Sequence, residues 1–171
     1  MGTVKLAVIG TWTGPLGAMG IPARAGAVLA GEEINAKGGF EVAGKKYKLE
    51  LLIEDDETKP ATAVGIVNRL MDQHNVKMMI GPFYSPSMLA VQPVTEPRGV
   101  VHITPASAPQ IIRPEVKNTF RTSTDAQMRS ELLAAAYKEM GMKTVAFITE
   151  NMATGQASYQ ANSAALEKMG V

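Results

Sequence analysis

The chain contains no cysteine, so it forms no disulfide, binds no metal through thiolates and has no cysteine nucleophile. It also lacks an excess of either charge, because 17 basic and 16 acidic residues leave a formal net charge of +1. A surface without a basic field disfavours nucleic acid and anionic membranes as partners. Of the 171 residues, 46% are hydrophobic and 19% are charged, which is typical of a globular chain with a buried core.

The sequence has no long apolar run suited to crossing a membrane. Its longest uncharged stretch covers residues 78–95, and Pro82, Pro86 and Pro93 interrupt it. The chain opens on a strand-like run, Val4–Gly10, without the basic and apolar regions of a signal peptide before it. We therefore expect any export signal to be absent from this sequence.

Strand-like and helical segments alternate along the chain. Strands are expected at residues 4–10, 47–53, 77–81, 100–104 and 144–149. Helices are expected at residues 23–36, 60–71, 85–97, 124–140 and 156–169. Strands separated by helices pair in parallel and carry helices on both faces. The sequence therefore predicts an α/β fold: a doubly wound parallel sheet of about five strands in three αβα layers, as in flavodoxin-like proteins. Residues 40–45 look like a hairpin arm that turns at Ala43-Gly44.

The loop after the third strand is the most informative, because ligands bind beyond the carboxyl ends of strands in such a sheet. Its sequence, Gly81-Pro82-Phe83-Tyr84-Ser85-Pro86-Ser87, places Ser85 at a helix N-cap and Pro86 in the first turn. The N–H groups of a helix N-terminus attract anions, and the serine hydroxyl can join them. A carboxylate the size of that in an amino acid fits there. The alternative is that Ser85 only caps its helix.

Two further loops reach the same edge of the sheet. The loop Thr104–Pro109 offers hydroxyls and carbonyls to an ammonium group, or is simply a turn shaped by its prolines. The loop Thr11–Gly17 is similar to the phosphate loop of flavodoxins, except that Leu16 stands where a small hydroxyl residue is expected. Trp12, the only tryptophan, either forms a wall of a ligand pocket or plugs the loop against the core.

No catalytic constellation is visible. Asp55-Asp56 suggests a metal or phosphoacceptor site, but the strands that carry acidic residues in receiver domains end here in Gly10-Thr11 and Gly81-Pro82. We therefore interpret the pair as a turn and helix-start feature. Neither His74 nor His102 has an Asp or Ser partner by spacing, and no known hydrolase motif occurs. We interpret His102 as a satisfied core residue and predict a binding protein rather than an enzyme.

Motifs spread over nearly the whole chain carry a family resemblance. They are Thr13-Gly14-Pro15-Leu16 with Gly17 and Gly20, Ile34–Gly39, Glu54-Asp55-Asp56 with Pro60, Ile80-Gly81-Pro82 with Ser85, Thr104-Pro105-Ala106, and Phe120-Arg121-Thr122 with Asp125. In this order they resemble the leucine/isoleucine/valine-binding family of class I periplasmic binding proteins. The resemblance implies a bilobed periplasmic or otherwise extracytoplasmic protein without a cofactor. It would bind amino acids or aromatic or aliphatic carboxylates and serve the permease of an ABC importer.

The resemblance also implies roles for single residues. Ser85, Ala106 and Ser107 match first-lobe residues that hold the backbone of an amino-acid ligand. Met19 falls where branched-chain binders place an aromatic side chain, and Thr154 falls where a second-lobe tyrosine is common. The full set of candidate ligand-binding residues is Trp12, Thr13, Met19, Tyr84, Ser85, Ala106, Ser107 and Thr154.

The family is much longer than this chain, which bears on its organisation. By the resemblance, residues 1–121 cover most of the first lobe and residues 122–171 cover the first helix, strand and helix of the second. Strands completing the first lobe are expected beyond Val171, so we predict weak or absent solute binding by the chain alone. Residues 122–171 either fold back, pairing Thr144–Thr149 with Val100–Thr104 in strand order 2-1-3-4-5, or are exchanged in a homodimer. The count of five strands favours folding back.

Two other functions remain open on the sequence. One is a flavodoxin-like electron carrier that binds FMN through Thr11–Gly17. The other is a ligand-sensing input domain with the same fold, which the sequence does not distinguish from a transport protein.

Overall fold

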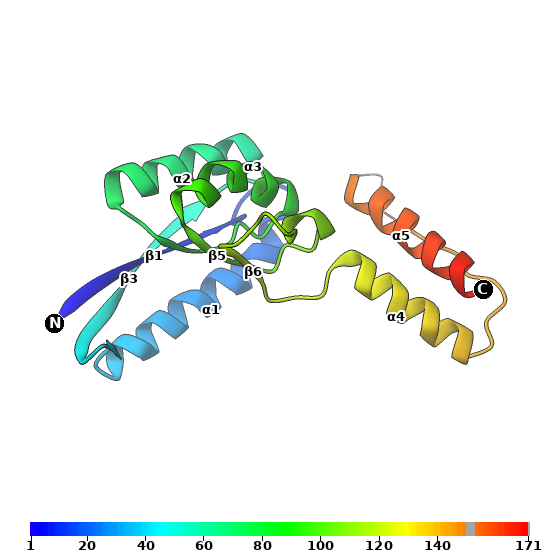
Figure 1. Ribbon diagram of the computed structural model, residues 1–171, viewed down its shortest axis with the longest axis horizontal. Helices are drawn as coiled ribbons and strands as arrows, with labels where there is room; N and C mark the ends of the chain where they lie inside the picture. The colour runs from blue at the N-terminus through cyan, green and yellow to red at the C-terminus, as the bar shows by residue number, and fades with distance from the viewer. Residues whose placement is uncertain (150–152, 171) are drawn as a thin grey trace. The chain divides into compact units, whose positions relative to one another are not determined.

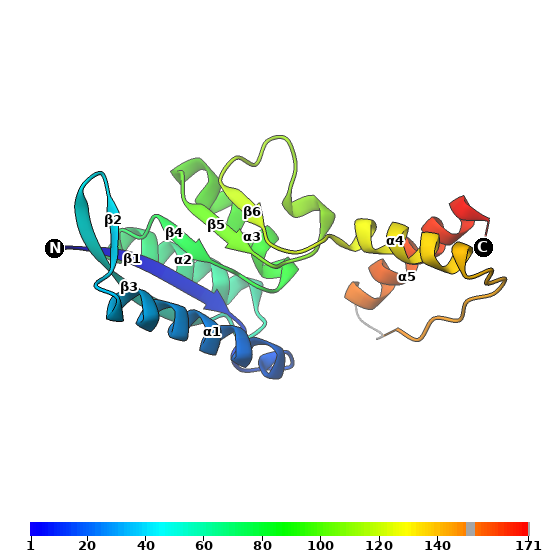
Figure 2. The same ribbon diagram turned by 90° about the horizontal axis from the view of Figure 1, so that it is seen from below.

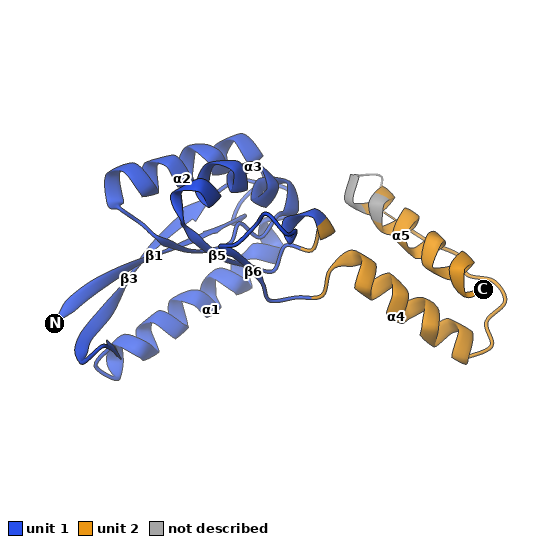
Figure 3. Ribbon diagram, viewed as in Figure 1, with its two compact units in different colours: residues 1–106, 110–123 blue, residues 107–109, 124–171 orange. Residues whose placement is uncertain are grey.

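The computed structural model describes residues 1–149 and 153–170 (Figure 1). The chain divides into two compact units (Figure 3). The first comprises Met1–Ala106 and Gln110–Ser123, and the second comprises Ser107–Pro109 and Thr124–Val171. None of the described helices is both long enough and apolar enough to span a bilayer.

The first unit is built on one six-stranded sheet. The strands are β1 (Gly2–Gly10), β2 (Phe40–Val42), β3 (Lys45–Asp55), β4 (Met78–Ile80), β5 (Val101–Thr104) and β6 (Thr119–Arg121). Their order is β2-β3-β1-β4-β5-β6. Every neighbouring pair is parallel except the hairpin of β2 and β3. The sheet confirms the predicted doubly wound α/β fold and the predicted hairpin.

The middle of the sheet explains the apolar run near the start of the chain. Strand β1 lies between β3 and β4, and its residues Ala7, Val8 and Ile9 are fully buried. A central parallel strand is covered on both faces, so it reads as a continuous apolar run rather than an alternating one. The register sets Gly10 of β1 opposite Asp55 of β3, which brings the loops after these strands together.

Helices cover both faces of the sheet (Figure 1). Helix α1 (Gly17–Ala36) lies over β1 and β3 on one face, while α2 (Pro60–His74) and α3 (Ser85–Thr95) lie on the other. Short 3₁₀ helices follow at Glu96–Arg98 and Pro109–Ile111. Helix α2 buries Ala63, Ile66, Val67, Leu70 and Met71, which is the spacing of one helical face.

One face of the sheet is covered only in part. Figure 2 shows the α1 side, on which no helix of the first unit lies in front of β4, β5 and β6. Met78, Ile103 and Phe120 lie on β4, β5 and β6 and are 44%, 41% and 56% exposed, whereas the residues that alternate with them, Met79, His102 and Thr119, are buried. In the sheet register Ile103 is paired with Phe120. We call these three residues the open sheet face.

The second unit consists of two packed helices and the segment between them. They are α4 (Ala126–Glu139) and α5 (Ala153–Met169), and their shared core is formed by Ala134, Ala165 and Leu166. Val145 and Phe147, from the segment between the helices, pack against this core.

The predicted strand at Thr144–Thr149 is not formed, since residues 142–149 are neither strand nor helix. Its predicted partner, Val101–Thr104, pairs with β4 on one side and β6 on the other. The prediction of a fold-back in strand order 2-1-3-4-5 was therefore wrong. A strand needs a neighbour for its backbone groups, and Thr119–Arg121 already occupies the place beside β5. The alternative, an exchanged homodimer, stays a prediction.

Candidate functional site

The candidate site lies at the carboxyl edge of the sheet in the first unit. The loops after β1, β3, β4 and β5 all begin there, because parallel strands end at the same edge. Hydrogen bonds tie these loops together in two groups. One group joins the loops after β1 and β3, and the other joins the loops after β4 and β5.

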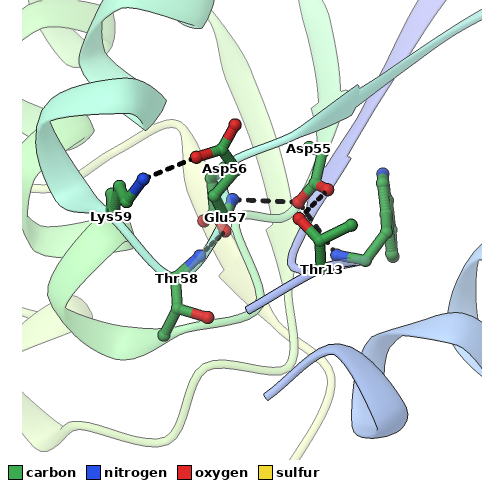
Figure 4. Close-up of polar contacts among 7 residues, drawn as sticks. Thr13, Asp55, Asp56, Glu57, Thr58 and Lys59 are labelled. Carbon is green, nitrogen blue, oxygen red and sulfur yellow. Dashed lines mark hydrogen bonds and ion pairs between the residues drawn. The ribbon is translucent and has the colours of Figure 1, made fainter. Parts of the chain in front are cut away.

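Asp55 holds the first loop in place (Figure 4). Its Oδ2 accepts a hydrogen bond of 2.6 Å from the Thr13 hydroxyl, and its Oδ1 accepts bonds of 2.9 Å from the amides of Trp12 and Glu57. Partial burial acts to raise the pKa of Asp55, but the bonds from Thr13, Trp12 and Glu57 together outweigh it and lower that pKa. The carboxylate therefore stays ionised, and Thr13 can offer a ligand only the lone pairs of its oxygen.

Asp56 serves the same turn from inside the protein. It is fully buried, and its Oδ1 accepts hydrogen bonds from the Thr11 hydroxyl at 2.6 Å and from the Thr58 amide at 3.1 Å. Its own amide donates to the Gly10 carbonyl at 2.9 Å. These bonds confirm the aspartate pair as a turn feature ahead of α2. Within residues 1–149 and 153–170, no group of three or more His, Asp or Glu side chains is placed to hold a metal.

Trp12 is packed into the loop rather than spread over its surface. Only 8% of the residue is exposed, and its ring meets Phe83 edge to face with centroids 5.8 Å apart. A Cβ at Gly10 would lie 2.5 Å from the indole, so glycine is needed beneath the ring. This burial favours the second of the two roles considered for Trp12, a plug against the core. Contact with a ligand stays a prediction.

The loop after β4 leads into α3, which begins at Ser85 and has Pro86 in its first turn. Tyr84, not Ser85, occupies the N-cap position, and no side chain caps the helix. The predicted N-cap was therefore one residue too late, because the helical backbone already includes Ser85. Tyr84 and Ser85 are both half-buried. The N–H groups of the first turn still point out of the helix end, as an anion site requires.

The loop after β5 is bonded to the loop after β4. The Thr104 hydroxyl donates to the Pro82 carbonyl at 2.6 Å and accepts a bond from the Ala106 amide at 3.1 Å. The Gly81 amide donates to the Ile103 carbonyl at 2.8 Å. The residues leading to Ser85 and those reaching Ala106 thus form one hydrogen-bonded group.

His102 braces this group from the core. It is fully buried, and its Nδ1 lies 2.8 Å from the Gly81 carbonyl, which only an N–H can satisfy. Burial lowers the pKa of His102, while the Gly81 carbonyl and Glu96 act in the opposite direction. The ring is therefore neutral at physiological pH. The predicted core position is confirmed, but Nε2 has no partner in the described part of the chain.

The remaining candidate residues differ in burial and in the unit to which they belong. Ala106 is buried with 2% exposure, whereas Met19 lies in α1 and is 78% exposed. Ser107 belongs to the second unit, where its carbonyl accepts a bond from the Ala126 amide at 3.1 Å. Thr154 lies in α5, and its side chain is outside the described residues. The ligand-binding roles of all eight candidates stay predictions.

Sequence reasoning missed three contributors to this edge. Phe83 supports Trp12, Asp55 holds Thr13, and Thr104 joins the loops after β4 and β5. A signal for Asp55 was present, since hydroxyl residues follow one strand and carboxylates follow the neighbouring one. The link through Thr104 depends on how β4 and β5 are registered, which short-range patterns do not carry.

Comparisons with known proteins agree with this architecture. The sequence profile of a family described as periplasmic binding protein matches residues 3–171. The chain therefore belongs to the periplasmic binding protein family, as the motifs indicated. A Pseudomonas aeruginosa protein named for binding leucine, isoleucine, valine, threonine and alanine is 34% identical over 159 residues, which are 90% of this chain and 40% of that protein.

Two solved structures extend the likeness. One is a solute-binding protein of an ABC transporter from Rhodopseudomonas palustris BisB5 in complex with 3,4-dihydroxybenzoic acid; it is 26% identical with a TM-score of 0.81, over 98% of this chain and 45% of that one. The other is a leucine-binding protein from Thermotoga maritima MSB8, also 26% identical, with a TM-score of 0.75 over 98% and 46% of the two chains. This chain spans less than half the length of these relatives.

Proposed function

We propose that the chain supplies the first lobe of a two-lobed, extracytoplasmic solute-binding protein that delivers a small carboxylate to an ABC importer. One observation carries the proposal: in the loop that leads to Ser85 and α3, the Pro82 carbonyl accepts a bond from the Thr104 hydroxyl, which also accepts from the Ala106 amide of the next loop. An anion-attracting helix end is thereby held near a backbone loop. Family membership supports the reading of this edge as a ligand site.

The two parts of the edge suit different ends of one ligand. The N–H groups of the first turn of α3 and the Ser85 hydroxyl suit a carboxylate. The Ala106 amide is engaged by Thr104, so the Ala106 carbonyl is the group that this residue can offer to an ammonium or hydroxyl. An amino acid and a hydroxylated aromatic acid both fit this description. Relatives named for aliphatic amino acids and one solved with 3,4-dihydroxybenzoic acid represent both classes.

The alternative FMN site is poorly supported by the first loop. A phosphate loop needs free hydroxyl and amide donors. Here Asp56 takes the Thr11 hydroxyl, while Asp55 takes the Thr13 hydroxyl and the Trp12 amide. A sensory input domain would use the same solute site, and the site chemistry does not separate it from a transport role.

The proposal is tested by nuclear magnetic resonance on the ¹⁵N-labelled chain, titrated separately with leucine and with 3,4-dihydroxybenzoate. We expect weak, saturable shifts confined to the amides around Ser85 and Ala106. Ser85→Ala should weaken the binding by about 1.5–3 kcal/mol, because a hydrogen bond to a charged group is lost. Ser87→Ala is the matched control, since Ser87 lies in the same turn but is fully buried. Shifts that avoid both loops, or equal effects of the two variants, would contradict the proposal.

A further inference from the structure

Thr104 is the last residue of β5, and it is fully buried. Its hydroxyl has one proton, which goes to the Pro82 carbonyl at 2.6 Å. The same oxygen therefore accepts from the Ala106 amide, at 3.1 Å, with a lone pair. One buried atom thus contacts two loops that belong to different strands.

Other bonds at this edge hold neighbouring backbone atoms. His102 Nδ1 and the Gly81 amide fix the backbone at Gly81, one residue before Pro82. The Thr104 carbonyl accepts from the Thr122 amide at 3.0 Å, which ties β5 to the segment after β6. The Thr104 hydroxyl joins the Ala106 amide to the loop that leads to Ser85.

The side chain itself is suited to fixing a distance. Threonine is branched at Cβ and is stiff about χ1, so its hydroxyl is held where the backbone of β5 places it. Both partner groups are backbone atoms, which cannot rotate away when the hydroxyl is removed. Loss of the hydroxyl leaves the buried Pro82 carbonyl and Ala106 amide without this partner, which loosens the two loops at these positions.

We infer that Thr104 is a positioning residue for ligand binding: its hydroxyl sets the spacing between Ser85 and Ala106 without touching the ligand. This rests on the proposed function, in which Ser85 faces the carboxylate and Ala106 faces the other polar end. A ligand of fixed length needs its two contacts at one separation. The hydroxyl is thus predicted to affect affinity through geometry rather than through contact.

The test compares three variants in the same ligand titration. Thr104→Val keeps the shape and removes the hydroxyl, and Thr104→Ser keeps the hydroxyl. Thr95→Val is the matched control, because the Thr95 hydroxyl is also buried and donates to a backbone carbonyl, that of Val91, at 3.1 Å. We expect Thr104→Val to weaken binding roughly ten-fold, while Thr104→Ser and Thr95→Val stay within about two-fold of the unmodified chain.

A double-mutant cycle separates positioning from a general loss of stability. If Thr104 acts through the turn at Ser85, Thr104→Val and Ser85→Ala together should weaken binding by less than the product of their separate effects. Unchanged affinity in Thr104→Val, or an equal loss in Thr95→Val, overturns the inference. Ligand shifts of the unmodified chain that avoid both loops contradict the proposed function instead.

A second measurement does not depend on the valine variant folding. In the unmodified chain the Ala106 amide should exchange its hydrogen slowly, because Thr104 Oγ1 accepts from it. Exchange at the rate of an exposed loop amide would show that the bond is absent and would overturn the inference.

Discussion

The ring of Trp12 meets the ring of Phe83 edge to face, with centroids 5.8 Å apart and planes at 88°. Trp12 follows β1 and Phe83 follows β4, so the pair joins loops that are 71 residues apart in sequence but adjacent in the sheet. The pair lies between the two hydrogen-bonded groups of loops at the candidate site. The ring pair is an apolar contact between these two groups of loops, each of which is held together by its own hydrogen bonds.

We expect Trp12→Ala to lower the free energy of unfolding by about 3–5 kcal/mol, because it empties a buried aromatic site. Trp12→Phe should cost less, since the indole N–H has no partner in the described part of the chain and no hydrogen bond is lost. Phe83→Leu should remove about 0.5–1.5 kcal/mol of ring–ring energy besides its change in packing. Urea denaturation followed by circular dichroism measures all three. A Trp12→Ala chain as stable as Trp12→Phe would show that the indole is not part of the core.

Two glycines of α1 should respond in opposite directions to alanine. A Cβ at Gly20 would lie 1.8 Å from the Thr11 carbonyl, whereas a Cβ at Gly26 meets nothing within 4 Å. Gly26→Ala should therefore stabilise the chain by about 1 kcal/mol, the gain in helix propensity. Gly20→Ala should destabilise it by about 1–3 kcal/mol, because α1 must move away from the loop after β1. Thermal unfolding of both variants checks this, and two shifts of the same sign would contradict the close approach.

Much of this arrangement could be predicted from short-range patterns. The apolar run of β1, the helical stripe of α2 and the turn at Ala43-Gly44 each depend on neighbours in sequence, and each was placed correctly. Thr144–Thr149 also has the pattern of a strand. A pattern records what a segment can form, while a strand also requires a partner at its edge. In the second unit Val145 and Phe147 pack against helices instead.

The location of the candidate site could be predicted from the sequence, but the hydrogen bonds that hold its loops could not. The rule that ligands bind at the carboxyl edge pointed to the loops after β1, β4 and β5. The bond from Thr104 to Pro82 depends on the register between two strands, and this register is set by the whole sheet. The sequence also did not show that Asp55 engages Thr13, since 42 residues separate them.

Stability should fall in mild acid because of His102. Burial lowers its pKa below the ordinary value of 6.5, so between that value and the folded-state pKa the unfolded chain binds more protons than the folded one. The contribution of His102 to the free energy of unfolding therefore rises with pH in this window, and it decreases as the pH falls below about 6.5. His102→Asn keeps a donor for the Gly81 carbonyl and should flatten this dependence. Urea midpoints from pH 5 to pH 8 check this; parallel curves for His102→Asn and the unmodified chain would contradict the assignment.

We expect the open sheet face to make the 171-residue chain prone to self-association. Parallel sheets are normally covered on both faces, yet Met78, Ile103 and Phe120 are 41–56% exposed on three adjoining strands. Exposed apolar side chains on neighbouring strands promote association. We expect the chain to bind a hydrophobic dye and to self-associate as its concentration rises in sedimentation experiments. Phe120→Thr, at the most exposed position of the face, should reduce both effects, whereas Met19→Thr, at an exposed position in α1, should not.

The same experiment distinguishes this face from exchange of residues 122–171 as the source of a dimer. Phe120→Thr should weaken association through the face, because the substitution removes apolar contact. It leaves the segment that connects the two units unchanged. An exchanged dimer would persist in Phe120→Thr and would dissociate only as slowly as the exchanged segment unfolds. A chain that stays monomeric and binds no dye at all concentrations would contradict both routes, and it would mean that the face is covered in solution by residues of the same chain.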